Sequence, residues 1–229
     1  MLLIYFVGAI YYLEYVFRIM SSGKIFGTGA FYSLIFAIPF GIICYLICGL
    51  FKESKRNKVA IILMGLITIL FMSQFIYFKI FRMFYSLYSA TKAGQVFEFW
   101  EIVVMKVRNN FSTIVLLSVP FMILLIFKKK IINIKPIHTK ERSYLLAGVV
   151  GCQLMGILSL GLAGKAIYSP YDLYFKHDYP VVAAEKLGLM TTLRLDVKRS
   201  LFEWSPSLEQ ASQEVTLIKD DSTQAVAPV

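Results

Sequence analysis

The chain has 229 residues, of which 58% are hydrophobic and only 17% are charged, and its formal net charge at pH 7 is +10. The charged residues are gathered between long uncharged runs, whereas a soluble domain disperses them over its surface. These features exclude an ordinary soluble domain and indicate a protein whose solvent is the lipid bilayer. We attribute the basic excess to membrane topology and contact with anionic lipid, and we expect no nucleic-acid partner.

Five apolar runs predict five transmembrane helices. An α-helix crosses the ~30 Å hydrocarbon layer in about 20 residues, and backbone groups in lipid must find partners within a helix or a closed barrel. The runs lack the alternating pattern of barrel strands, so we expect an all-α polytopic membrane protein. The expected spans cover residues 2–20, 30–51, 59–83, 111–127 and 143–163.

Two of these spans raise a further question. The first could be a cleavable signal peptide, but no basic segment precedes it and its apolar run is long for one, which favours a retained helix. The fourth is short and contains Pro120, and we expect it to begin a few residues before Phe111.

The positions of Lys and Arg predict the orientation. Residues 52–58 carry a net charge of +3 and residues 128–142 a net charge of +5, whereas residues 164–229 carry −2. Basic loops stay in the cytoplasm. We therefore expect a plasma-membrane protein with a cytoplasmic N-terminus and an extracytoplasmic C-terminal tail.

Two amphipathic helices are expected outside the spans. In residues 96–111 the apolar side chains recur at helical spacing, which predicts either an interfacial helix with Trp100 at headgroup depth or an ordinary packed loop helix. A second helix is expected over residues 187–204, lying along the outer surface and packed against either the membrane or the 96–107 amphipathic helix. We expect its docking residues to be Met190, Leu193, Arg194, Val197 and Leu201.

Charged residues within the spans are candidate lipid-headgroup contacts. Glu14 and Arg18 lie four apart on the first span, and either one alone would cost roughly 2.5–3.5 kcal/mol at the bilayer centre. They form either a snorkelling ion pair or a headgroup site. Lys79 and Arg82 at the end of the third span either snorkel or contact phosphate. The headgroup candidates are Glu14, Arg18, Lys79, Arg82 and Trp100.

The residues for catalysis or metal binding are sparse. The two histidines, His138 and His177, lie far apart in sequence, and no zinc, nucleotide or nucleophile motif is present. Asp172 and Asp178 give only a weak cation signal. We expect no catalytic residue, no metal and no cofactor in this chain. The three cysteines, Cys44, Cys48 and Cys152, are interpreted as small apolar residues, and four glycines as helix-packing positions: Gly148, Gly151, Gly156 and Gly161.

Three segments of the chain resemble one family. SQFIYFKIFRMFYSLYSATKAGQVFEFWEIV, KLGLMTTLRLDVKRSLF and EYVFRIMSSGKIF resemble the membrane part of the lipoteichoic acid synthases, which are phosphoglycerol transferases of the alkaline phosphatase and sulfatase superfamily. The resemblance extends over most of the chain. It implies a Gram-positive plasma membrane, phosphatidylglycerol as the lipid handled by the whole protein, and transfer of glycerol phosphate to a growing polymer.

The resemblance also implies a domain organisation. We expect a transmembrane domain over residues 1–163, a juxtamembrane helical linker over 164–206 and a flexible tail over 207–229 that leads to a catalytic domain missing from this chain. In the family that sulfatase-like domain carries a threonine nucleophile and a divalent metal, Mn²⁺ or Mg²⁺. Thr191 and Thr192 do not match that nucleophile, so no catalytic role is transferred.

Three functional hypotheses follow. The favoured one is a membrane-anchoring module for such a phosphoglycerol transferase. The second is a standalone transporter-like protein, for which broken spans or internal repeats would be expected. The third is a non-enzymatic partner or regulator.

The orientation is testable with single cysteines at positions 54 and 212, placed in a background without the three native cysteines. We expect a membrane-impermeant maleimide added to intact cells to label position 212 and not position 54, because the basic loops face the cytoplasm. Labelling of position 54 with position 212 silent would reverse the topology.

Overall fold

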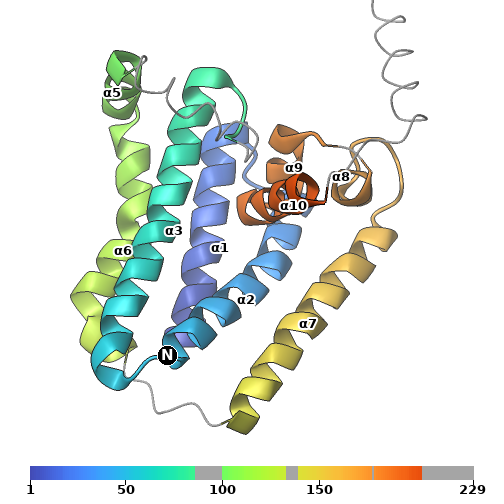
Figure 1. The fold of residues 1–229 in the computed structure, drawn as a ribbon. Coiled ribbons are helices and arrows are strands. Elements are labelled where there is room, and N and C mark those ends of the chain that lie inside the picture. The colour runs from blue at the N-terminus through green and yellow to red at the C-terminus, as the bar shows by residue number, and fades with distance from the viewer. Residues whose placement is uncertain (86–99, 133–138, 177, 203–229) are drawn as a thin grey trace, which may run out of the picture.

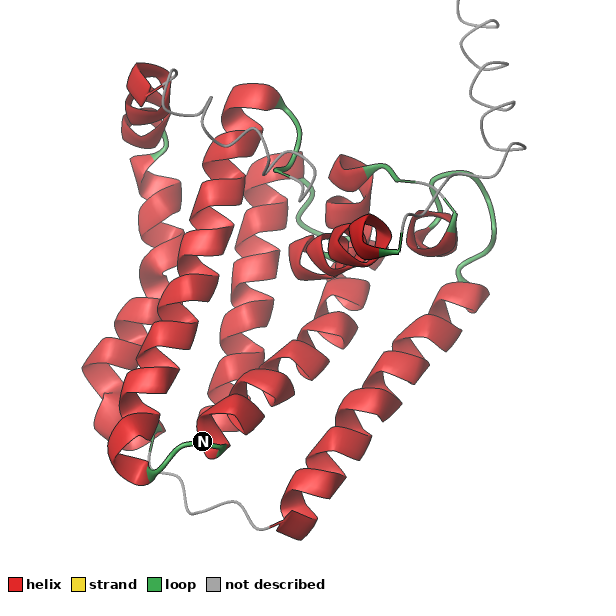
Figure 2. Cartoon of the chain, viewed as in Figure 1, coloured by secondary structure: helices red, strands yellow, loops and turns green. Residues whose placement is uncertain are grey.

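The computed structural model describes residues 1–85, 100–132, 139–176 and 178–202, and the regular structure in these ranges is entirely helical (Figure 1, Figure 2). The expected all-α fold class is confirmed. The helices are α1 (Leu2–Ser22), α2 (Thr28–Gly49), α3 (Glu53–Phe81), α5 (Trp100–Asn109), α6 (Phe111–Ile131), α7 (Thr139–Leu162), α8 (Pro170–Phe175), α9 (Pro180–Leu187) and α10 (Leu189–Leu201).

Five of these helices, α1, α2, α3, α6 and α7, are long and apolar enough to cross a membrane, as the sequence predicted. They run alternately up and down, so that the described parts of both basic segments lie at one end of the bundle, called here the basic end. Helices α5, α8, α9 and α10 lie at or near the opposite end, called here the tail end (Figure 1).

The boundaries of α6 differ from those expected. The helix does not begin before Phe111, because Asn110 separates it from α5. It is kinked at Phe127, the residue at which the span was expected to end, where φ is −101° and ψ is 17°, and a further helical segment continues to Ile131. Three consecutive lysines form its last turn. Cations at a helix C-terminus are favoured by the helix dipole, and their long side chains can reach the interface, which is consistent with a helical segment beyond the kink.

Helix α1 is central and packs against α2, α3 and α6. At its tail-end half the ring of Phe17 lies 5.8 Å from that of Phe71 and 5.5 Å from that of Phe84, measured between centroids. These rings belong to a buried cluster that joins α1 to α3. Since lipid tails are as apolar as the side chains, close van der Waals packing of this kind is what holds the spans together.

Two tyrosines of α1 bond to carbonyl groups around Pro120, which lies inside α6. Proline has no N–H, so it leaves the Leu116 carbonyl one turn earlier without its usual helical partner. The Tyr12 hydroxyl donates to that Leu116 oxygen at 3.2 Å, and the Tyr5 hydroxyl donates to the oxygen of Pro120 at 2.5 Å. The proline is tolerated because a neighbouring span supplies the missing donor.

Helix α7 lies at the edge of the bundle, packed on α2. The expectation that four of its glycines are packing positions is wrong for three of them. A Cβ atom added at Gly148, Gly151 or Gly161 would meet nothing within 4 Å, whereas one at Gly156 would lie 2.7 Å from the Phe36 ring of α2. Only one face of an edge helix touches protein, so its other glycines face away from the bundle.

Helices α8, α9 and α10 fill the space between the tail-end halves of α2 and α7 (Figure 1). A second apolar cluster joins them to these spans through Leu160 of α7, Leu173 of α8, Leu187 of α9 and Leu195 of α10. The juxtamembrane segment expected over residues 164–206 is therefore packed into the bundle as far as α10. The tail expected over 207–229 lies outside the described residues.

The packing predicts different outcomes for two glycine-to-alanine changes on α7. Gly156→Ala should destabilise the chain in detergent by roughly 1–3 kcal/mol, because the new methyl group overlaps Phe36. Gly151→Ala should leave the thermal midpoint unchanged or raise it slightly. Equal midpoints for the two variants would contradict the α2–α7 contact.

Candidate functional site

A carboxylate inside the first span holds the beginning of α10. Glu14 is buried at 3% exposure, and its two carboxylate oxygens accept hydrogen bonds from the backbone N–H groups of Leu189 at 2.6 Å and Met190 at 2.7 Å. These are the first two residues of α10, whose N–H groups have no partner within the helix. A negative charge is also favoured there by the helix dipole.

The contact lies well inside α1. Glu14 precedes the last residue of the helix, Ser22, by eight positions, which corresponds to roughly 12 Å along the axis. The N-terminus of α10 is therefore inserted into the bundle beside α1. The segment expected to pack against the membrane surface or the 96–107 helix thus packs at its N-terminal end against α1.

Gly188 makes this approach possible. Its φ is +93°, a backbone conformation that other residues rarely adopt, and an added Cβ would lie 3.0 Å from the Glu14 carboxyl group. The glycine ends α9 and begins α10, so it divides into two helices the segment that was expected to be one.

Arg18, one turn further along α1, is buried by the α1–α2 connection and by α9. Its Nη2 donates to the Ile25 carbonyl oxygen at 2.7 Å, and Nε has no hydrogen-bond partner among the described residues. A Cβ added at Gly29 would lie 2.9 Å from Arg18 Nη1 and 2.2 Å from the Glu185 backbone oxygen, so only glycine fits there.

Of the two alternatives left open for Glu14 and Arg18, the structure bears on the ion pair. Within the described part of the chain the two side chains form no ion pair, although they lie four apart on the same helix. Each is buried against a different backbone segment. Glu14 attaches the juxtamembrane segment to α1, and Arg18 is bonded to the α1–α2 connection.

Further polar contacts fasten this segment to its surroundings. Lys24 and Glu185 form a 2.6 Å ion pair between the α1–α2 connection and α9. Lys186 Nζ donates to the backbone carbonyl oxygen of Tyr168 at 2.6 Å. Exposed pairs of this kind contribute roughly 0–1 kcal/mol each. They fix the register of α9, while the buried Glu14 contact carries more of the stability.

Arg194 of α10 lies among aromatic rings. Its guanidinium carbon is 5.8 Å from the Phe36 ring centroid and 5.6 Å from that of Tyr174, and its Nη2 donates to the Tyr174 hydroxyl at 2.8 Å. Gln153 of α7 donates to the same hydroxyl. These contacts join α2, α7, α8 and α10. Arg194, one of the expected docking residues, therefore makes direct contacts that hold α10 in place.

The buried face of α10 differs from the apolar face chosen from the sequence. Met190 and Leu193 are half-buried against the main cluster, whereas Val197 and Leu201 are exposed at 42% and 68%. The fully buried residues are Leu189, Thr191, Thr192 and Leu195. Apolar periodicity missed the threonines, and the Thr192 hydroxyl tolerates burial because it donates to the Gly188 oxygen at 2.9 Å.

The other three headgroup candidates lie near the tail end. Lys79, in the last turn of α3, donates to the Met20 oxygen at 3.0 Å, while Arg82 ends the helix with φ +58° and is exposed. Trp100 is the first residue of α5 and is 61% exposed. The chain beyond Arg82 is held by Gln74, which forms two hydrogen bonds with the backbone of Tyr85.

The contacts among the described residues position helices, and we recognise no catalytic arrangement among these residues. They hold no group of three or more potential metal ligands. The two candidate cation ligands are engaged elsewhere, since Asp172 accepts the Tyr168 N–H and Asp178 forms a 2.5 Å ion pair with Arg199. The three cysteines are free, and the two histidines lie outside the described residues.

Comparisons with protein-family models, with curated proteins and with solved structures found no match to this chain.

Glu14→Ala tests the attachment of α10. The change leaves two buried N–H groups without an acceptor, and hydrogen bonds to a charged group contribute roughly 1.5–3 kcal/mol each. We expect the amides of residues 189–201 to exchange with solvent deuterium at least about tenfold faster in nanodiscs.

Two further variants serve as controls for that measurement. Glu14→Gln retains one acceptor oxygen and should give an intermediate rate. Glu101→Ala, which removes an exposed acid from α5, should change nothing at α10. Unchanged exchange in Glu14→Ala would show that the carboxylate does not hold the helix.

Proposed function

We propose that this chain is the membrane-anchoring part of a lipoteichoic acid synthase-like phosphoglycerol transferase. In this role it holds an extracytoplasmic, sulfatase-like catalytic domain over the outer leaflet of a Gram-positive plasma membrane, where that domain uses phosphatidylglycerol. The motif resemblance supplies the family, and the observation that best supports an anchoring role is the docking of α10 on Glu14.

Docking of α10 has a direct mechanical consequence. A catalytic domain joined through a free linker would sample many heights and orientations above the lipid. A chain that leaves the bundle from a helix fixed to two spans has a defined point of exit. Such an anchor keeps the catalytic domain close to lipid headgroups, and orientation of this kind contributes to rate by lowering the entropic cost of the reaction.

The distribution of charge supports the proposed orientation. The described parts of both basic segments lie at the end of the bundle opposite α10 (Figure 1). With these segments in the cytoplasm, the tail end faces outward. There α8, α9 and α10 occupy the outer half of the membrane, next to the lipid that the transferase would use.

A chimera tests the proposal. A catalytic domain of the family, joined after Val229, should make glycerol phosphate polymer in a strain lacking its own synthase. The same domain on an unrelated single transmembrane helix should make less. Glu14→Ala in the chimera should lower polymer yield about tenfold by loosening the exit point.

Two results would count against the anchoring role. One is equal polymer yield from the unrelated helix and from this chain, at matched levels in the membrane. The other is turnover of labelled phosphatidylglycerol by the purified chain alone, with Mn²⁺ or Mg²⁺, that a point mutation within residues 1–229 abolishes. That second result would reveal a catalytic site in the membrane part itself.

A further inference from the structure

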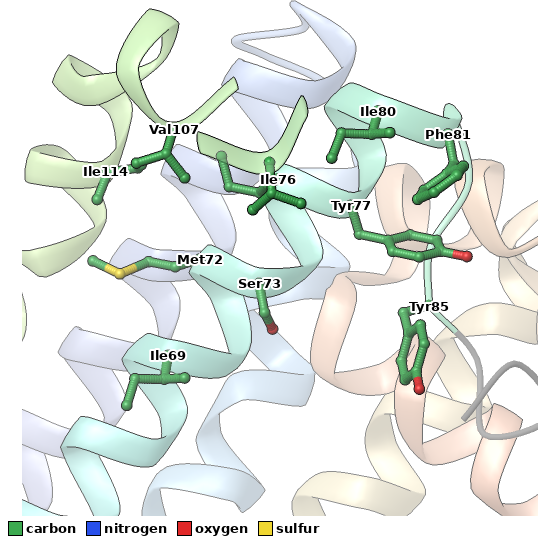
Figure 3. A pocket seen from close by; sticks show the side chains of 11 residues that line it. Ile69, Met72, Ser73, Ile76, Tyr77, Ile80, Phe81, Tyr85, Val107 and Ile114 are labelled. Atoms are coloured by element: carbon green, nitrogen blue, oxygen red, sulfur yellow. The ribbon is translucent and has the colours of Figure 1, made fainter. Parts of the chain in front are cut away.

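An apolar groove runs along the tail-end half of α3, on the side that faces α5 and α6 (Figure 3). Its volume is about 510 Å³. Ile69, Met72 and Ile76 of α3 form its floor, and Val107 of α5 and Ile114 of α6 face them across it. The groove is open to the surroundings, since Ile69 at one end is 63% exposed.

The length of the groove matches one leaflet of a membrane. The lining residues extend from Ile69 to Phe81, twelve positions apart on one helix, which corresponds to roughly 18 Å. Half of the ~30 Å hydrocarbon layer is about 15 Å. The groove runs along α3, a helix long enough to span the membrane, and the acyl chains of a bilayer lie in the same direction as such a helix.

The chemistry of the lining suits an acyl chain. The hydroxyl of Ser73, a polar group on the floor, donates to the Leu70 oxygen at 2.9 Å and so has its proton engaged within α3. Tyr77 and Tyr85 pack edge to face at the tail-end side of the groove, with ring centroids 5.2 Å apart. Tyrosines of this kind are typical of the layer where acyl chains meet headgroups.

Cations cluster near the tail end of the groove, next to residues that line it. Lys79 lies in the last turn of α3, where its Nζ also donates to the Met20 oxygen of α1, and Arg82 follows as the residue that ends the helix. Lys106 is half-buried on α5 between Val103 and Val107, which both line the groove. Over residues 79–85 and 100–109 the described chain carries four cations, Lys79, Arg82, Lys106 and Arg108, against one acid, Glu101.

We propose that this groove is a binding site for an anionic phospholipid. One acyl chain lies along α3 against Ile69, Met72 and Ile76, and the phosphate lies among Lys79, Arg82 and Lys106. The charge excess at the mouth selects an anionic lipid over a zwitterionic one with the same acyl chains. The proposal is independent of the anchoring role, because it needs no catalytic domain.

Native mass spectrometry of the full chain tests both parts of the site. The protein would be released from nanodiscs containing equal amounts of dioleoyl phosphatidylglycerol and dioleoyl phosphatidylcholine. We expect one retained phosphatidylglycerol in preference to phosphatidylcholine. Lys79→Gln, Arg82→Gln and Lys106→Gln should each reduce that preference about fivefold, whereas Lys198→Gln on α10 should not.

A second pair of variants tests the groove itself. Ser73→Trp fills the floor and should remove the retained lipid whatever its headgroup. Leu158→Trp adds the same ring at a 72% exposed position on α7 and should leave retention unchanged. Equal loss in both tryptophan variants would mean that the lipid is only part of the general annulus, and the proposal would be wrong.

Photocrosslinking distinguishes the other possible occupants. A benzophenone amino acid at position 73 should attach to phosphatidylglycerol in the nanodisc. Attachment to residues 86–99 of the same chain, or to a second copy, would overturn the proposal by identifying a protein occupant. An unchanged lipid preference in all three glutamine variants would overturn the headgroup assignment.

Discussion

The contact between the Glu14 carboxylate and the first two N–H groups of α10 decides how the juxtamembrane segment is arranged. Burying a carboxylate away from water is unfavourable, and so is burying backbone N–H groups that lack an acceptor. The two hydrogen bonds satisfy both kinds of group at once, so neither penalty remains. The contact draws α10 into the bundle, brings α9 against the α1–α2 connection, and requires glycine at position 188. The fixed exit of the chain follows from it.

The same constraint, that polar groups without water must find protein partners, explains other features of the bundle. Tyr12 supplies the donor that Pro120 removes from α6, and Gln74 satisfies the backbone at Tyr85 beyond the end of α3. Arg18 is bonded to the carbonyl of Ile25 in the connection that covers it. In each case a side chain of one element satisfies the backbone of another, so these bonds also specify which elements are neighbours.

The two ends of the bundle consequently have different roles. The basic end carries the lysines of α6 and a contact between α2 and α7, in which Arg142 of α7 donates to the Gly49 backbone oxygen of α2. The tail end carries the docked helices and the apolar groove with its cations. The proposed lipid site and the helices that direct the departing chain thus lie at the same end of the bundle, as the proposed anchoring role would require.

The sequence by itself determined the membrane class, the five spans and the segregation of charge, because a run of about 20 apolar residues is a local property that needs no partner. The tertiary structure decided which polar groups meet. Leu189 lies 175 residues from Glu14, and no local pattern joins them. It also decided that Gly156 alone among four glycines of α7 is packed, and that Thr191 and Thr192 are buried on α10 while Val197 is exposed. Such outcomes depend on which face of each helix meets a neighbour, and periodicity along one helix does not contain that information.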